Sequence, residues 1–231
     1  MATVLITGAN RGLGLEFCRQ YAADGWNVIA CCRNPDDAFD LNTLAGRQQN
    51  IRLETLDVSK LEQIDALSRK LAGLPIDALI NNAGIYADNK SNGFGRLDYQ
   101  AWTNSLLINT QAPVKMAEAF LPHINNSAQK LIVNISSLMG SIADNGHGGS
   151  ILYRTSKAAL NAAMKSLAIE LKEQSVGVLI VHPGWVKTDM GGPNGLINAE
   201  QSVAGMRTVI KNFSLDQTGC FVKYDGTPLP W

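Results

Sequence analysis

Short runs rich in β-branched residues alternate with longer segments of helical periodicity along almost the whole chain. The runs lie at 3–7, 27–32, 51–56, 78–81, 130–136, 178–182 and 220–224, and the helical segments near 12–24, 61–71, 98–121, 151–173 and 199–212. This order predicts parallel strands joined by crossover helices. Several runs are continuously apolar, as is typical of strands covered on both faces. We therefore predict a single α/β domain over residues 1–231, with a doubly wound parallel sheet of about seven strands and helices on both faces.

Composition and charge exclude several classes of protein. The 231 residues carry 20 lysines and arginines against 20 aspartates and glutamates, so no net field attracts nucleic acid or an anionic membrane. No apolar run approaches the ~18 residues that a membrane-spanning helix needs. Cleavage of a leader at the N-terminus would remove the first core strand, so we expect a cytoplasmic protein. The four cysteines, Cys18, Cys31, Cys32 and Cys220, lack metal-ligand spacing, and we expect reduced packing residues and no metal site.

A glycine-rich turn follows the first run and opens into a helical segment. It reads Thr-Gly-Ala-Asn-Arg-Gly-Leu-Gly over residues 7–14. Such a turn allows backbone N–H groups and the helix N-terminus to face a pyrophosphate. Three residues and then one separate its glycines, which differs from the usual GxGxxG spacing. The residues expected to contact a dinucleotide here are Gly8, Asn10, Arg11, Gly12, Leu13 and Gly14.

This turn resembles the nucleotide loop of the short-chain dehydrogenase/reductase family. Further motifs follow in the family's order: Asp57-Val58, then Asn81-Asn82-Ala83-Gly84, then His182-Pro183-Gly184. In the family these motifs contact adenine, line the cofactor cleft, and hold the nicotinamide carboxamide and the pyrophosphate. The resemblance implies a Rossmann-like fold over essentially the whole chain. It also implies cofactor contacts from Asp57, Val58, Asn82, Ala83, Gly84, Pro183, Gly184, Val186 and Thr188.

The end of the second strand indicates which nicotinamide cofactor binds. A carboxylate there would hydrogen-bond the 2′-hydroxyl of NAD, whereas an arginine would pair with the 2′-phosphate of NADP. The strand ends in Cys32-Arg33 with no acid, and Arg33 and Arg11 match positions where NADP-preferring family members carry basic residues. NADP(H) is therefore favoured over NAD(H). In the alternative, Arg33 is a solvated surface residue and Asp36 or Asp37 reaches the ribose.

Tyr153 and Lys157 stand four residues apart at the start of a helical segment, so both project from one face. A free tyrosine has a pKa near ~10, and a nearby ammonium group stabilises its phenolate. We expect the lysine to lower the tyrosine pKa. The pair resembles the tyrosine and lysine of the family's catalytic set, which also implies that both residues contact the cofactor.

The resemblance implies two further catalytic residues, Ser137 and Asn109. Ser137 is the second of two serines after the fifth strand, and Ser136 is the alternative. Asn109, in Leu107-Ile108-Asn109-Thr110, matches the asparagine that positions a water for proton relay. The segment between Ser137 and Tyr153 is a few residues longer than is usual in the family.

Together these residues predict an NADPH-dependent reductase of aldehydes, ketones or related carbonyls, with Tyr153 as general acid. Residues 183–195 and 224–231 resemble the C-factor-like and sniffer-type carbonyl reductase subgroup. The alternative function is a nucleotide-binding signalling or regulatory protein with little turnover. We expect a small-molecule substrate, a flexible substrate loop at about 189–198, and a homodimer or homotetramer.

Overall fold

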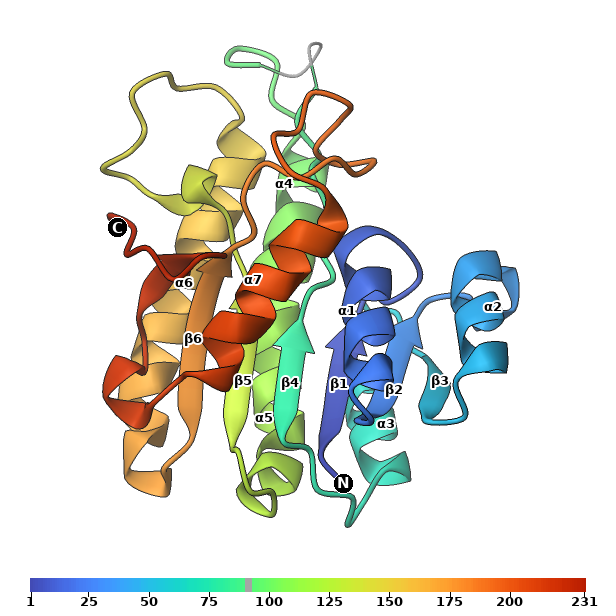
Figure 1. The fold of residues 1–231 in the computed structure, drawn as a ribbon. Coiled ribbons are helices and arrows are strands. Elements are labelled where there is room, and N and C mark those ends of the chain that lie inside the picture. The colour runs from blue at the N-terminus through green and yellow to red at the C-terminus, as the bar shows by residue number, and fades with distance from the viewer. Residues whose placement is uncertain (90–92) are drawn as a thin grey trace.

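The computed structural model describes residues 1–89 and 93–231, which form a parallel sheet between two layers of helices (Figure 1). Among these residues the strands are β1 (Thr3–Thr7), β2 (Asn27–Cys32), β3 (Ile51–Thr55), β4 (Ala78–Asn81), β5 (Leu131–Ile135), β6 (Gly177–His182) and β7 (Phe221–Lys223). They lie in the order β3-β2-β1-β4-β5-β6-β7, and each neighbouring pair is parallel. The predicted fold class is confirmed.

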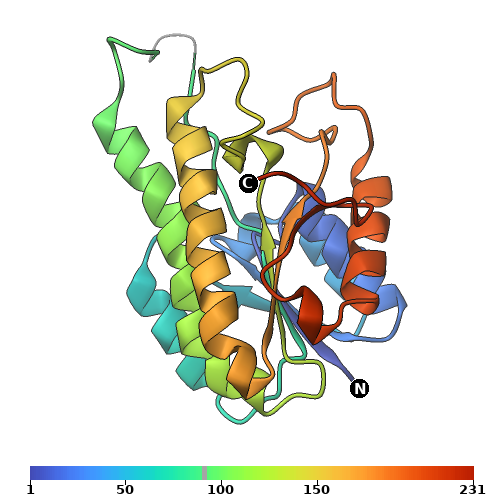
Figure 2. The same cartoon turned by 90° about the vertical axis from the view of Figure 1, so that its left-hand side faces the viewer.

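The helices cover the sheet on both faces (Figure 2). They are α1 (Gly12–Ala23), α2 (Phe39–Arg47), α3 (Leu61–Lys70), α4 (Tyr99–Leu106), α5 (Ala112–Asn125), α6 (Ile151–Leu171) and α7 (Ala199–Lys211). Because side chains alternate along a strand, Val4 and Ile6 pack in a core with α1, α2 and α7. Leu5 packs in the opposite core with α3, α5 and α6. Burial on both faces explains why several strands read as continuous apolar runs.

Two helical features differ from the sequence-based expectation. The helix predicted over 98–121 is divided into α4, a π-helical turn at Leu107–Gln111, and α5. Pro113 lies in the first turn of α5 and has no N–H, so it cannot bond the carbonyl of Asn109 in an α-helical pattern. Helix α2 was not predicted, and of its nine residues only Leu41 is buried. A helix with so small an apolar face carries little periodic signal.

The strand order reverses direction at β1, whose neighbours are β2 and β4. In open α/β sheets, ligands bind in the crevice beyond the carboxyl ends of the strands at such a switch point. The glycine-rich turn follows β1, and the Asn-Asn-Ala-Gly segment follows β4. The topology therefore places both motifs at the same crevice. Within residues 1–89 and 93–231, no helix has the length and apolar character needed to cross a membrane.

Candidate active site

The glycine-rich turn is held in place by the segment after β4. The Asn82 side-chain amide donates to the carbonyls of Thr7 (2.9 Å) and Gly8 (3.1 Å). In return the Thr7 hydroxyl accepts from the backbone N–H groups of Asn82 and Ala83, each at 3.0 Å. Asn82 thus connects the segment after β4 to the segment after β1 at the switch point. This structural role is additional to its predicted contact with the cofactor.

The turn has the shape that a pyrophosphate requires. Gly8 and Gly12 have φ of +66° and +54°, and a Cβ at Gly14 would lie 2.1 Å from the Gly8 carbonyl oxygen. Helix α1 begins at Gly12 without a side-chain cap on its first N–H groups. An uncapped helix N-terminus behind a close backbone turn is a site for an anion. The residues present therefore fit a dinucleotide, with Asn10 and Arg11 exposed on the turn.

The basic residues predicted to select the cofactor are both exposed. Arg33 directly follows β2, as predicted, and Asp36 and Asp37 lie beyond it in a short 3-10 helix. Arg11 forms an ion pair with Asp189 at 2.7 Å, which connects the glycine-rich turn to the loop after β6. An exposed pair of this kind exchanges readily with another anion.

The other predicted cofactor residues line the same edge. Asp57 and Val58 follow β3 and are half-buried. One Asp57 carboxylate oxygen accepts from the backbone N–H (3.0 Å) and hydroxyl (2.7 Å) of Ser59, which orders the turn after the strand.

The loop after β6 contacts the glycine-rich turn. A Cβ at Gly12 would lie 3.6 Å from Thr188 Cγ2, and Gly184 has φ of +85°. Internal hydrogen bonds hold the loop: Trp185 Nε1 donates to the Gly191 carbonyl at 2.7 Å, and the Gly191 N–H donates to the Thr188 hydroxyl at 3.2 Å. Pro183 and Val186 belong to the same connection, and Val186 is buried. The structure thus brings this motif to the predicted cofactor crevice.

The structure distinguishes the two adjacent serines. The Ser136 hydroxyl donates to Asn161 Oδ1 at 2.6 Å in a buried pair. The Ser137 hydroxyl instead acts on Tyr153, where it lowers the pKa of the phenol, and it accepts from the Met139 N–H at 3.1 Å. Ser137, which the sequence favoured over Ser136, is therefore the serine that acts on Tyr153.

Tyr153 and Lys157 lie together on α6, as their spacing predicts. Lys157 Nζ is 5.8 Å from the centre of the Tyr153 ring and donates to the Ile135 carbonyl at 2.8 Å. Burial raises the pKa of Tyr153 to about 12, although the Ser137 hydrogen bond acts to lower it. Burial also lowers the pKa of Lys157 to about 8. The expected lowering of the tyrosine pKa is not seen, because burial of the phenol dominates in this structure.

Asn109 lies in the π-helical turn, a feature frequently found at functional sites. Its side chain is fully buried and its amide is already engaged: Oδ1 accepts from the Ile85 N–H at 2.8 Å, and Nδ2 donates to the Ile85 carbonyl and to the Ser156 hydroxyl, each at 2.9 Å. A Cβ at Gly84 would lie 3.2 Å from Asn109 Oδ1 and 3.7 Å from Lys157 Nζ. Asn109 thus lies beside the lysine and ties α4–α5 to the segment after β4.

Sequence reasoning missed two residues beside Tyr153, namely Tyr86 and Asp88. The rings of Tyr86 and Tyr153 have their centres 4.9 Å apart, and the Tyr86 hydroxyl is hydrogen-bonded to Ser150 at 2.6 Å. Asp88 accepts hydrogen bonds from the backbone of Leu152 and Tyr153. Tyr86 and Asp88 follow the Asn-Asn-Ala-Gly motif closely, but no sequence pattern places them against a helix more than 60 residues away.

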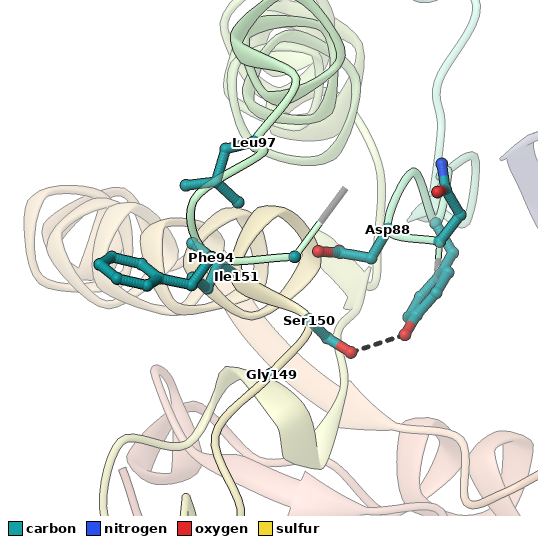
Figure 3. Close-up of a pocket in the computed structure, with 9 residues that line it drawn as sticks. Asp88, Phe94, Leu97, Gly149, Ser150 and Ile151 are labelled. Carbon is teal, nitrogen blue, oxygen red and sulfur yellow. Dashed lines mark hydrogen bonds between the residues drawn. The ribbon is translucent and has the colours of Figure 1, made fainter. Parts of the chain in front are cut away.

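A pocket of about 430 Å³ lies next to these residues (Figure 3). Its walls come from the connection between β4 and α4 and from the start of α6, including Tyr86, Asp88, Phe94, Ser150 and Ile151. Large exposed apolar side chains also occur on the loops that follow β4, β5 and β6. They are Tyr86, Phe94, Ile142, Trp185, Met190 and Leu196. The carboxyl edge of the sheet therefore carries an apolar rim around the reactive residues.

Known proteins share both the sequence pattern and the fold of this chain. The family model described as short chain dehydrogenase matches residues 2–196. The chain is 40% identical over 157 residues to C-signal of Myxococcus xanthus, covering 68% of this chain and 93% of that protein. It is 36% identical over the whole of both chains to 1-hydroxy-2-glutathionyl-2-methyl-3-butene dehydrogenase of Rhodococcus sp. (strain AD45).

Among solved structures, the carbonyl reductase Sniffer of D. melanogaster superposes with a TM-score of 0.93 at 36% identity and covers both chains fully. The NADPH-bound carbonyl reductase from chicken fatty liver gives a TM-score of 0.93 at 34% identity, covering 100% of this chain and 99% of that one. The resemblance to the C-factor-like and sniffer-type subgroup is therefore confirmed. The chain belongs to the short-chain dehydrogenase/reductase family of oxidoreductases.

Proposed function

We propose that the protein is an NADPH-dependent carbonyl reductase in which Tyr153 is the general acid. The observation that carries the proposal is that Lys157 Nζ lies 5.8 Å from the centre of the Tyr153 ring, while the Ser137 hydroxyl acts on the same phenol at the carboxyl edge of the sheet. These two hydroxyls can donate to one oxygen atom. A substrate carbonyl oxygen at that point would be stabilised as it gains negative charge.

Each residue has a distinct part in the proposed reaction. The bound dihydronicotinamide would supply a hydride to the carbonyl carbon. Ser137 would hold the carbonyl oxygen by a hydrogen bond, and Tyr153 would donate its hydroxyl proton to that oxygen. With a pKa of about 12, Tyr153 is protonated at neutral pH, which is the form that an acid requires. Proton donation of this kind typically contributes roughly 10²–10⁴-fold.

Lys157 and Asn109 would support the proton transfer. With a pKa of about 8, Lys157 carries its proton at neutral pH, and its ammonium would stabilise the tyrosinate left after the transfer and bind the nicotinamide ribose. Because residue 113 is proline, the Asn109 carbonyl lacks the donor that an α-helix would give it. In the proposed reaction that carbonyl would hold a water that returns a proton to the site.

The preference for NADP(H) rests on Arg33 at the end of β2 and Arg11 on the glycine-rich turn. Two guanidinium groups suit a 2′-phosphate, and the strand end itself carries no acid to accept a hydrogen bond from a 2′-hydroxyl. Bound NADPH or NADP is named for several structures similar to this chain, including the chicken enzyme and a short-chain dehydrogenase/reductase from Burkholderia multivorans.

The apolar rim favours carbonyls that carry an apolar group.

The proposed function is tested by following cofactor oxidation with the purified protein. NADPH and NADH are compared over a panel of aldehydes, ketones, quinones and dicarbonyls. We expect turnover with a marked preference for NADPH. Absence of turnover on every carbonyl, with NADPH still bound tightly, would contradict the reductase proposal.

A second candidate is a nucleotide-binding signalling or regulatory role with little turnover. The 40% identity to a protein named C-signal favours it. A protein that only senses the nucleotide has no need of Ser137, Tyr153, Lys157 and Asn109 in one site, so reduction is the primary proposal. A cytoplasmic location and a homodimer or homotetramer remain predictions.

A further inference from the structure

Helix α6 carries both Tyr153 and Lys157, but its N-terminus has no cap from its own segment. The residue before the helix, Ser150, adopts a left-handed conformation (φ 46°, ψ 45°) and its side chain caps no helix N–H. Its hydroxyl is hydrogen-bonded to Tyr86 instead. The first N–H groups of any helix lack intrahelical partners. Those of α6 must therefore find acceptors elsewhere in the fold.

Asp88 supplies these acceptors from a distant part of the sequence. Its Oδ1 accepts from the Leu152 N–H at 3.1 Å, and its Oδ2 accepts from the Tyr153 N–H at 2.8 Å. One carboxylate thus satisfies two N–H groups in the first turn. Its negative charge also suits the positive end of the helix dipole. Figure 3 shows Asp88 and Ser150 on the wall of the same pocket.

The segment that carries Asp88 holds Tyr153 at two points. Asp88 fixes the backbone of Tyr153, and the ring of Tyr86 lies against the Tyr153 ring with 4.9 Å between centres. The same segment is anchored at its start, because both backbone polar groups of Ile85 bond the side chain of Asn109. The position of Tyr153 is therefore fixed by the segment after β4 as well as by its own helix.

We propose that Asp88 is a positioning residue for the reaction, which fixes Tyr153 by capping α6 in place of a local residue. This inference rests on the proposed reductase function. Asp88 acts through the backbone of α6 and not on the reacting atoms. Loss of the cap would let the first turn of α6 fray and the phenol move. A misplacement of about 1 Å in a reacting group costs roughly 10²-fold in rate.

The test compares three variants of the whole protein. Asp88→Ala removes both acceptors, and Asp88→Asn keeps one oxygen that can accept. Asp98→Ala is the matched control, because Asp98 caps α4 by accepting from the Ala101 N–H at 2.9 Å, on a helix without Tyr153. We expect Asp88→Ala to lower kcat tenfold or more while KM for NADPH stays within twofold. Asp88→Asn should lose only two- to threefold in kcat, and Asp98→Ala less than twofold.

Two kinetic results would overturn the proposal. One is a kcat for Asp88→Ala within twofold of that for Asp98→Ala. The other is an Asp88→Asn variant as slow as Asp88→Ala, because a remaining hydrogen-bond acceptor would then do nothing to position Tyr153. If Asp88→Ala does not fold, the Asp88→Asn variant is used by itself. A two- to tenfold loss in kcat supports the proposal, and a smaller or larger loss overturns it.

Amide hydrogen exchange separates this inference from the proposed function. We expect the N–H groups of Leu152 and Tyr153 to exchange at least tenfold faster in Asp88→Ala than in Asp98→Ala. If the wild-type protein reduces no carbonyl, the reductase proposal fails, and the exchange rates still decide whether Asp88 caps α6. Equal exchange at both amides in the two variants would overturn the cap itself.

Discussion

The Ser136 hydroxyl donates to Asn161 Oδ1 over 2.6 Å, so this serine links the end of β5 to the middle of α6. Its neighbour Ser137 acts instead on Tyr153, where its hydroxyl lowers the pKa of the phenol. The two hydroxyls therefore have separate tasks. Ser137→Ala should lower kcat by roughly 10²–10³-fold with little loss of stability, because it removes a donor to the developing oxyanion.

Ser136→Ala is the matched variant and should have the opposite profile. It leaves a buried amide oxygen of Asn161 without its donor, which costs about 1–3 kcal/mol of unfolding free energy. Its kcat should stay within about threefold of wild type, because the Ser137–Tyr153 pair is intact. Steady-state kinetics and urea unfolding measure both effects. A larger kcat loss in Ser136→Ala than in Ser137→Ala would reverse the assignment.

The buried charge of Lys157 is expected to reduce the stability of the folded protein. Burial lowers its pKa from 10.5 to about 8, so the folded state holds the charged form at a cost of roughly 3 kcal/mol at neutral pH. Lys157→Met fills the same space without a charge. It should raise Tm at pH 7 while it lowers turnover more than 100-fold.

The pH dependence of this effect has a definite sign. Between pH 8 and 10 the folded state releases the Lys157 proton before the unfolded state does, so wild-type stability should rise relative to that of Lys157→Met. Urea unfolding of both proteins at pH 7, 8, 9 and 10 isolates the lysine, because the other titrating groups are common to both. A stability difference that does not change with pH would contradict the buried charge.

Gly14 should tolerate no side chain. A Cβ there would lie 2.1 Å from the Gly8 carbonyl oxygen, so Gly14→Ala must displace the turn that we propose binds the pyrophosphate. We expect NADPH binding to weaken at least 100-fold. The control is Gly46→Ala in α2, where a Cβ meets nothing within 4 Å and stability should be equal or up to about 1 kcal/mol higher. Fluorescence titration with NADPH distinguishes the two, and unchanged binding in Gly14→Ala would contradict the assigned phosphate site.

Arg33 should discriminate between the two nicotinamide cofactors. Arg33→Ala removes the proposed charged partner of the 2′-phosphate, which is worth roughly 10–100-fold in affinity for NADPH. Affinity for NADH should change less than twofold. Titrations with both cofactors at two salt concentrations check this expectation. An equal loss for NADPH and NADH would instead favour a general role in folding or binding.

The sequence predicted the sheet well because the central strands, covered on both faces, are apolar at most positions. Each of the strands in the structure begins and ends within one residue of its predicted bounds. The interrupted helix could have been inferred from Pro113, which cannot donate to the carbonyl of Asn109. The nine-residue helix α2 could not have been inferred from the sequence, since its only buried residue is Leu41.

Most of the predicted site residues could be placed from local patterns. They directly follow strands, and the carboxyl ends of parallel strands lie at the same edge of the sheet. The choice between Ser136 and Ser137 needed the structure, since it depends on Asn161 from a different element. The contacts of Tyr86 and Asp88 with the start of α6 also depend on tertiary packing. The pKa of Tyr153 was misjudged because the spacing shows its lysine neighbour and not the depth of its burial.

The most direct test of the central claim is the turnover of Tyr153→Phe with NADPH and the best carbonyl substrate of the panel. The substitution removes one hydroxyl and leaves the ring contact with Tyr86 in place. If Tyr153 is the general acid, the variant binds NADPH with wild-type affinity and loses more than nine-tenths of its turnover. Turnover above a tenth of the wild-type value would contradict the assignment.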